Sequence, residues 1–319
     1  MKKSPAAPTR TSGVGLISMS VFGHDVRYAG GAIENAELVP RVYPGWTLRV
    51  YAEAGHAVIP LLLERDAEVV EVEVTTGNPA LHYWHTMTRF HAAADPVAEW
   101  IVFRDADSRV NVREAAAVAE WCRSGRALHV MRDHPLHEAA MLAGMWGVQG
   151  GRLEHIAEWT ASWRARAGQR GVDQAFLAEA VDPTFADSER VEHGAGTSRS
   201  GQPFPPHPPY AGFVGQVVPP ADVTATLFRE AVRQKRPLRR ARVRSAELDD
   251  EVLLYEPIGK ATIRLSESAA TVWHLCDGSR SVADLIALVG TAYPEDVTAA
   301  AELETVVQRL ASQGVIELA

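Results

Sequence analysis

Two aspartates stand one residue apart directly after an apolar run, an arrangement that can bind a divalent cation. Residues 100–104 predict a buried strand, and Asp105 and Asp107 follow it. Ligands of open α/β sheets bind at the carboxyl ends of strands, where paired carboxylates can hold Mg²⁺ or Mn²⁺ and leave coordination positions for substrate phosphates. The neighbouring Arg104 and Arg109 favour a site for a metal ion and a diphosphate, although a capped turn between a strand and a helix uses the same residue types.

The segments around this motif alternate between short apolar runs and longer helical stretches. This alternation predicts an α/β domain with a mainly parallel sheet. A segment rich in Gly, Ser and Pro at 187–220 predicts a long loop, and residues 222–244 predict a basic helix. The expected strands are 14–23, 46–53, 67–74, 99–107 and 127–133, and the expected helices are 32–43, 58–66 and 112–125.

Length and composition set the outer limits of the interpretation. The 319 residues predict one large or two unequal domains, and 46% hydrophobic with 23% charged residues excludes a disordered or fibrous chain. No apolar run reaches the roughly 20 residues that a membrane-spanning helix needs. Residues 1–12 lack the apolar core of a signal peptide and predict a loose tail. Cys122 and Cys276 are the only cysteines, too few for a disulfide framework, so we expect a cytoplasmic protein.

The charge is divided unevenly along the chain. The formal net charge is −8, but residues 229–244 carry eight Lys or Arg and one Glu. Residues 249–319 carry twelve Asp or Glu and four Lys or Arg. We therefore expect a basic helical linker at 226–246 that is solvated or binds an acidic peptide or phosphates, followed by an acidic unit at 247–319.

The motifs of the first 218 residues, taken together, resemble those of bacterial glycosyltransferases of the GT-A fold. The matching segments are VFGHDVRYAGGAIENAELV, YPGWTLRVY, FRDADSR, REAAAVAEW, HVMRDHPLH and MWG. The resemblance implies a GT-A-like, Rossmann-type sheet over residues 13–225, with a nucleotide-sugar donor, expected to be a UDP-sugar, over its N-terminal half. It implies that Asp105 and Asp107 grip Mn²⁺ or Mg²⁺, with His193 as a third ligand. The donor contacts that it implies are Ser20, Phe22, Arg27, Tyr28, Arg89, Arg104, Asp105 and Arg109.

The chemistry of such a donor assigns roles to further polar residues. Breaking the anomeric bond releases a nucleoside diphosphate, whose growing charge a divalent cation stabilises. Asp173 and Asp133 are the candidate general bases for an acceptor hydroxyl, and Asp173 lies in a segment that resembles the helix start facing donor and acceptor in GT-A enzymes. Arg132 is a further candidate donor of hydrogen bonds to phosphate. These residues leave inversion and retention at the anomeric carbon equally open.

Residues 247–319 carry a separate pattern of two strands followed by three helices. The segments LLYEPIGKATIRLSESAATVWHLCDGSRSVADL and LASQGVIEL resemble the small, winged-helix-like α+β domains of the PqqD type, the RiPP recognition elements that bind leader peptides. The resemblance implies that a leader adds as a strand along Ala261–Leu265 and packs against the last helix near Val306 and Leu310. The acidic charge of this unit argues against a nucleic-acid partner. A packing appendage or a dimerisation module, and with it a homodimer, fits the same pattern.

Together the two resemblances predict a metal-dependent hexosyltransferase that glycosylates the core of a ribosomally made precursor peptide whose leader the C-terminal unit binds. Tethering would raise the local concentration of the acceptor. One competing hypothesis is a glycosyltransferase for a saccharide or small molecule, with the C-terminal unit as a docking module. The others are a non-catalytic binding protein for peptides or nucleotide-sugars, and a nucleotidyl- or phosphotransferase that uses the same carboxylates.

Overall fold

The protein is built around a seven-stranded mixed sheet. The computed structural model describes residues 15–74, 82–195, 201–248, 251–257, 260–296 and 298–319. The strand order is β3-β2-β1-β4-β6-β5-β7, and β6 alone runs against the other strands. This sheet confirms the predicted α/β fold class. The bounds are β1 (Gly15–Val21), β2 (Thr47–Glu53), β3 (Glu68–Val72), β4 (Trp100–Arg104), β5 (Leu128–Arg132), β6 (Met145–Gln149) and β7 (Arg190–Gly194).

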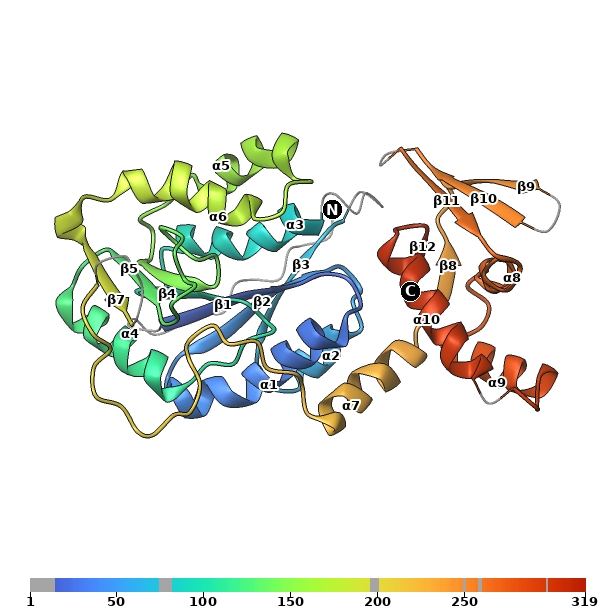
Figure 1. The fold of residues 1–319 in the computed structure, drawn as a ribbon, viewed down its shortest axis with the longest axis horizontal. Helices are drawn as coiled ribbons and strands as arrows, with labels where there is room; N and C mark the ends of the chain where they lie inside the picture. The colour runs from blue at the N-terminus through green and yellow to red at the C-terminus, as the bar shows by residue number, and fades with distance from the viewer. Residues whose placement is uncertain (1–14, 75–81, 196–200, 249–250, 258–259, 297) are drawn as a thin grey trace.

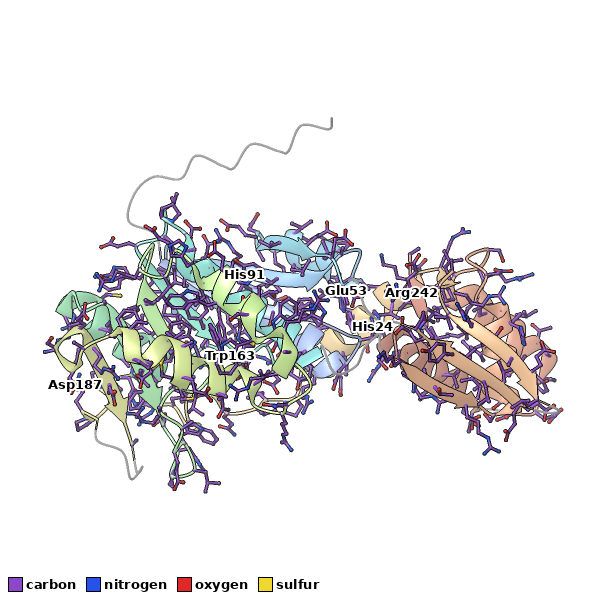
Figure 2. The ribbon with its side chains drawn as sticks, turned by 90° about the horizontal axis from the view of Figure 1, so that it is seen from above. His24, Glu53, His91, Trp163, Asp187 and Arg242 are labelled. Carbon is purple, nitrogen blue, oxygen red and sulfur yellow. The ribbon has the colours of Figure 1, made fainter. Side chains whose placement is uncertain are left out.

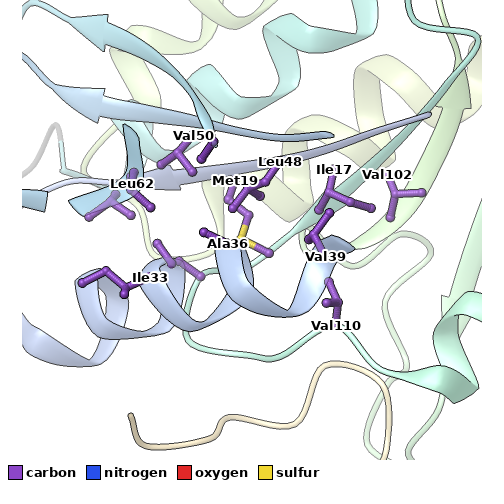
Figure 3. Close-up of a cluster of buried hydrophobic side chains, with 14 of the residues drawn as sticks. Ile17, Met19, Ile33, Ala36, Val39, Leu48, Val50, Leu62, Val102 and Val110 are labelled. Atoms are coloured by element: carbon purple, nitrogen blue, oxygen red, sulfur yellow. The ribbon is translucent and has the colours of Figure 1, made fainter. Parts of the chain in front are cut away.

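Helices cover both faces of the sheet, so the central strands are buried on both sides (Figure 1). Every residue of β1 is buried, which explains its continuous apolar run. Figure 3 shows the core on one face, where Ile33 and Ala36 pack towards Met19 and Val50. The helices of that face include α1 (Val26–Val42), α2 (Val58–Leu63), α4 (Val112–Ser124) and α7 (Asp222–Arg233). The other face carries α3 (His82–His85), the 3-10 helix η2 (Thr86–Ala94), α5 (Ile156–Ser162) and α6 (Val172–Phe176).

Two strands of the sheet, β6 and β7, are not among those expected from the sequence. The middle of β6 is Gly147, which weakens any strand pattern. A Cβ atom there would lie 2.9 Å from the carbonyl oxygen of Ile101 and 3.0 Å from the ring of Trp121, so only glycine fits. Strand β7 lies within the segment that was expected to be a loop. The loop therefore starts later than expected.

The C-terminal unit has its own core and its own sheets. Three antiparallel strands, in the order β11-β10-β9, pack with three helices around a cluster that includes Leu254, Trp273 and Val307. The second helix begins at Ser281, whose hydroxyl caps it as part of a capping box. The bounds are β9 (Arg244–Leu248), β10 (Glu251–Glu256), β11 (Ala261–Leu265), α8 (Glu267–Leu275), α9 (Val282–Ala292) and α10 (Ala299–Ser312), while β12 (Ile316–Leu318) pairs with β8 (Pro237–Arg239).

The basic segment differs from the predicted linker helix. It is helical only as far as Arg233, after which the chain forms β8 and β9. Because β8 pairs with the last strand, the C-terminal unit begins before residue 247. The basic side chains join parts of this chain: Arg233 pairs with Glu304 at 3.0 Å, and Arg242 pairs with Glu256 at 2.8 Å. None of the described helices has the length and apolarity that a membrane crossing requires.

Candidate active site

A buried arginine joins two of the predicted carboxylates. The Nη2 atom of Arg89 lies 2.9 Å from Oδ1 of Asp105 and 3.4 Å from Oδ2 of Asp173. The arginine side chain is 4% exposed, whereas that of Asp105 is 47% exposed and that of Asp173 is 22% exposed. The two carboxylates are therefore open to solvent, while the arginine that contacts both is buried beneath them. Three separate elements, η2, the end of β4 and α6, supply these side chains.

Strand β1 fixes the position of Arg89. The hydroxyl of Ser18 donates to the carbonyl oxygen of Arg89 at 2.8 Å. The hydroxyl of Ser20 donates to the carbonyl oxygen of Thr86 at 3.0 Å. Nη1 of Arg89 donates to Oγ of Ser20 at 3.4 Å. Ser20, which was expected to contact the nucleotide-sugar donor, contacts Arg89 instead. Together these hydrogen bonds hold η2 against the sheet beneath the site.

Asp107 lies in the same cluster, close to the first turn of α1. Burial raises the pKa of Asp107 above its usual range, the negative charge of Asp105 raises it further, and Arg27 and Arg89 oppose the shift. Burial and the charge of Asp107 likewise raise the pKa of Tyr28. Arg27 donates to the Tyr28 hydroxyl at 3.0 Å. The structure therefore brings Arg27 and Tyr28 to the paired aspartates, as a donor site requires.

The two aspartates depend on close contacts with other parts of the chain. A Cβ atom on Gly144 would lie 2.2 Å from Oδ2 of Asp105, and one on Gly31 would lie 1.9 Å from the carbonyl oxygen of Ala106. The amide of Val218 donates to the carbonyl oxygen of Asp107 at 2.9 Å. The two glycines and the end of the Pro-rich loop shape the site although they carry no reactive side chain. A search of the sequence for reactive residue types therefore does not find them.

The carboxyl of Asp173, the candidate general base, has a raised pKa. Burial raises the pKa of its carboxyl, Asp105 adds to the shift, and the charge of Arg89 lowers it. Its Oδ1 accepts a hydrogen bond from the amide of Gln174 at 2.9 Å, so the carboxylate is oriented by its own helix. A carboxylate with a raised pKa accepts a proton more readily than an ordinary one.

Arg104 and Arg109 were expected to contact phosphate, and the structure corrects both. Arg104 is fully buried, donates to the carbonyl oxygen of Gly144 at 2.6 Å and lies 3.3 Å from the equally buried Glu114. Arg109 is 8% exposed, and its Nε donates to Glu34 at 2.7 Å. Their charges are used inside the protein, where they hold the loop after β4 against its neighbours.

Arg132 and Asp133 are corrected for the same reason. Arg132 is 2% exposed and forms an ion pair with Glu192 of β7. Asp133 accepts two hydrogen bonds from Arg113 at 2.6 and 2.7 Å and one from the amide of Val214 at 2.9 Å. These three hydrogen bonds engage both oxygens of Asp133, so we take Asp173 as the better candidate for the base.

His193 and Phe22 also have partners within the protein. His193 is fully buried on β7, and its Nδ1 lies 2.8 Å from Nε2 of His129. Burial lowers the pKa of both histidines, so two neutral rings share this hydrogen bond. Nε2 of His193 lies 3.8 Å from Oε1 of Glu120, and within the described part of the chain no three His, Cys, Asp or Glu side chains group as a metal site. Phe22 is buried and stacks on His85 with 5.4 Å between ring centroids.

In the C-terminal unit, a groove lies beside the end of the edge strand β11, between the start of α8 and the helix α10. Among the described residues β11 pairs with β10 alone. The groove has a volume of about 660 Å³ including its open mouth, and Ser266, Val306 and Arg309 are among the residues that line it. Val306 is half-buried, as a peptide-binding wall requires. Leu310, expected in the same wall, is instead fully buried in the core.

The order of strands and helices in this unit agrees with a known family. Residues 251–316 match the family of coenzyme PQQ synthesis protein D (PqqD). We call residues 237–319 the PqqD-like domain and residues 15–221 the N-terminal domain. No curated protein matches the chain.

Solved structures are similar to different shares of the chain. TbiB1 in complex with the TbiA(beta) leader peptide shares 22% identity over 25% of this chain and 94% of its own, with a TM-score of 0.23. A glycosyltransferase involved in glycosylation of the major capsid of PBCV-1 shares 17% identity over 57% of this chain and 81% of its own, with a TM-score of 0.40. The mannosyltransferase PcManGT from Pyrobaculum calidifontis, in complex with GDP-Man and Mn²⁺, shares 12% identity over 98% of this chain and 90% of its own, with a TM-score of 0.35.

Proposed function

We propose that the N-terminal domain is a metal-dependent glycosyltransferase that acts on a precursor peptide bound by the PqqD-like domain. The observation that carries this proposal is the convergence of Arg89, Asp105, Asp107 and Asp173 at the carboxyl edge of the sheet. Ligands of α/β sheets bind at this edge. The reaction moves a sugar from a nucleotide-sugar, which we expect to be a UDP-sugar, to a side chain of the peptide core.

Asp105 and Asp107 fit a divalent cation. Two carboxylates close enough to raise the pKa of one of them repel each other, and a cation between them would offset that repulsion. Carboxylate oxygens suit Mn²⁺ and Mg²⁺, and both ions take further oxygen ligands from water and phosphate. When bound, such an ion stabilises the negative charge that develops on the departing diphosphate.

The side chains around these aspartates divide the remaining work. Arg27 and Tyr28 lie on the donor side of the site and can donate hydrogen bonds to the phosphates. Asp173 accepts the proton of the acceptor hydroxyl while the acceptor oxygen bonds to the anomeric carbon and the bond to the diphosphate breaks. Arg89 contacts Asp105 and Asp173 through the same Nη2 atom, so it would hold the carboxylate of the metal site and the base close together.

The PqqD-like domain is anchored beside this edge of the sheet. Nζ of Lys235, in the segment that enters the domain, donates to the carbonyl oxygen of Gly55 at 2.7 Å, and Nη2 of Arg240 lies 3.8 Å from Oε1 of Glu53. Glu53 is the last residue of β2, so these contacts are at the carboxyl end of a strand next to β1. Figure 2 shows His24 and Glu53 at the boundary between the two domains. A peptide held by this domain is therefore tethered close to the donor site.

The experiment that tests the proposal is mass spectrometry of the full chain with a candidate precursor peptide encoded beside its gene, Mn²⁺ and a panel of sugar nucleotides. We expect the peptide to gain one sugar and the donor to release a nucleoside diphosphate. Release of pyrophosphate would instead indicate a nucleotidyltransferase. Equal transfer to the core peptide with its leader removed would contradict a role for the PqqD-like domain in acceptor selection.

A further inference from the structure

The three helices of the PqqD-like domain border a second hollow. It has a volume of about 950 Å³ including its open mouth. Its apolar lining comes from all three helices and includes the half-buried Leu275, Val289 and Val306. Tyr293, 62% exposed, stands at the end of α9 and lines the same hollow. The space is large enough for an aromatic or a long aliphatic side chain.

The rim of this hollow is acidic. Glu267 begins α8, Asp296 precedes α10 and Glu302 lies in its first turn, and all three side chains are exposed. Among the described lining residues none is Lys or Arg. Residues 249–319 carry a net charge of −8, and these three carboxylates are part of it, so the rim lies in a negatively charged part of the chain.

The hollow is continuous with the groove beside β11. Ser268, Glu302 and Val306 line both spaces. The groove begins at Ser266, directly after the last residue of β11, so a chain that leaves β11 at its Leu265 end passes over these residues into the hollow. A peptide paired with β11 therefore has a path to a second, apolar contact.

We propose that the peptide segment adjoining the one paired with β11 inserts a large apolar side chain, flanked by Lys or Arg, into the hollow of α8, α9 and α10. This inference rests on the proposed peptide recognition and adds the chemistry of the recognised segment. The apolar side chain fits the lining, and the basic flank complements the rim. A second copy of this chain is a poorer fit, because basic side chains such as Arg233, Lys235 and Arg240 already have partners within the chain.

The test uses a displayed library of random peptides selected on the full-length protein. We expect enriched peptides to carry an aromatic or large aliphatic residue next to Lys or Arg. In the double variant Glu267→Lys/Glu302→Lys we expect these peptides to bind about tenfold more weakly, because two attractive contacts become repulsive. Selection on that variant should enrich Asp or Glu instead. The control is Glu247→Lys on β9, the far edge of the sheet, which makes the charge change of one of the two substitutions.

A neutral variant separates the apolar contact from the charges. Tyr293→Ser should reduce the preference for a large apolar residue and keep the preference for Lys or Arg. Enriched peptides without basic residues, or equal binding to the double variant, would overturn the proposed anchor while leaving strand addition intact. Failure of the wild-type protein to enrich any peptide would overturn peptide recognition itself. If a variant lacking residues 1–12 binds the peptides more tightly, the hollow holds the protein's own N-terminal segment and the proposal is wrong.

Discussion

Arg89 and Asp173 are 84 residues apart in the chain, yet Nη2 of the arginine lies 3.4 Å from Oδ2 of the aspartate. The same nitrogen lies 2.9 Å from Asp105, which follows β4. The buried guanidinium of Arg89 therefore balances the charge of the carboxylate in the proposed metal site and that of the proposed base. A change at Arg89 should be visible in the proton affinity of Asp173, which gives the site a signature beyond loss of activity.

Arg89→Gln should move the acidic limb of the pH profile to higher pH. Asp173 acts as a base only when ionised, so activity is present above its pKa and is lost as the pH falls through it. Burial raises the pKa of Asp173 and the charge of Arg89 lowers it, so removal of the Arg89 guanidinium should raise this pKa further. The measurement is kcat/KM against pH for peptide glycosylation. The control is Arg166→Gln, which removes an exposed arginine paired with Glu179. An acidic limb that stays in place or moves to lower pH in Arg89→Gln would contradict the assignment of Asp173 as the base.

Asp107→Asn should remove binding of a nucleoside diphosphate that depends on Mn²⁺. One of the two proposed carboxylate ligands is lost, and we expect affinity for the metal and nucleotide to fall by about a hundredfold, the scale of a lost charged contact. Titration calorimetry with UDP and Mn²⁺ measures this loss, and peptide binding should be unchanged. Asp187→Asn is the matched control because its side chain is fully exposed at the end of the molecule farthest from the PqqD-like domain (Figure 2). Full nucleotide affinity in Asp107→Asn would rule out the metal site.

The local sequence pattern indicates some residues of the proposed site, and it misleads where a distant partner determines the contacts of a side chain. Asp105, Asp107 and Asp173 stand at the end of a strand or the start of a helix, which a local pattern reveals. Arg104 has the same local pattern as an arginine that binds phosphate, and only the fold places it against Glu114. His193 likewise has its partner 64 residues earlier in the chain, at His129.

The basic segment shows the same limit on the scale of a domain. Its charge predicted a solvated or ligand-binding helix, but β8 pairs with β12 at the other end of the unit. Charge density along the sequence gives the number of Lys and Arg side chains that need a partner. It does not indicate whether those partners are solvent molecules or carboxylates of the same chain. The acidic composition of residues 249–319 supplied some of those partners, among them Glu256 and Glu304.

The ion pair between Arg104 and Glu114 should be essential for stability. Both side chains are fully buried, so removing one partner leaves the other charge without compensation in the core. We expect Arg104→Gln to lower the free energy of unfolding of the N-terminal domain by about 3 kcal/mol or more. Urea unfolding followed by the fluorescence of the buried Trp121 and Trp146 measures the change.

The control for this prediction is an exposed ion pair in the same domain. Arg152 and Glu189 have side chains 45% and 38% exposed, so Arg152→Gln should cost less than about 1 kcal/mol. If Arg104→Gln unfolds at the same urea concentration as the wild type and loses nucleotide affinity, Arg104 contacts the donor as the sequence suggested, and the structural role given to it here is wrong.

Val306→Asp should separate peptide binding from donor chemistry. Val306 lines the groove beside β11 and the neighbouring hollow, so the variant places a carboxylate where a bound peptide would exclude water. We expect the affinity for a peptide selected on the wild type to fall about thirtyfold, which corresponds to about 2 kcal/mol. Hydrolysis of the nucleotide-sugar without a peptide should keep its wild-type rate, because the N-terminal domain is untouched. Ala287→Asp makes a similar change on the exposed face of α9 and should leave both measurements unaltered. Loss of peptide binding and donor hydrolysis together in Val306→Asp, with an unchanged melting temperature, would show that the two domains do not have separate roles.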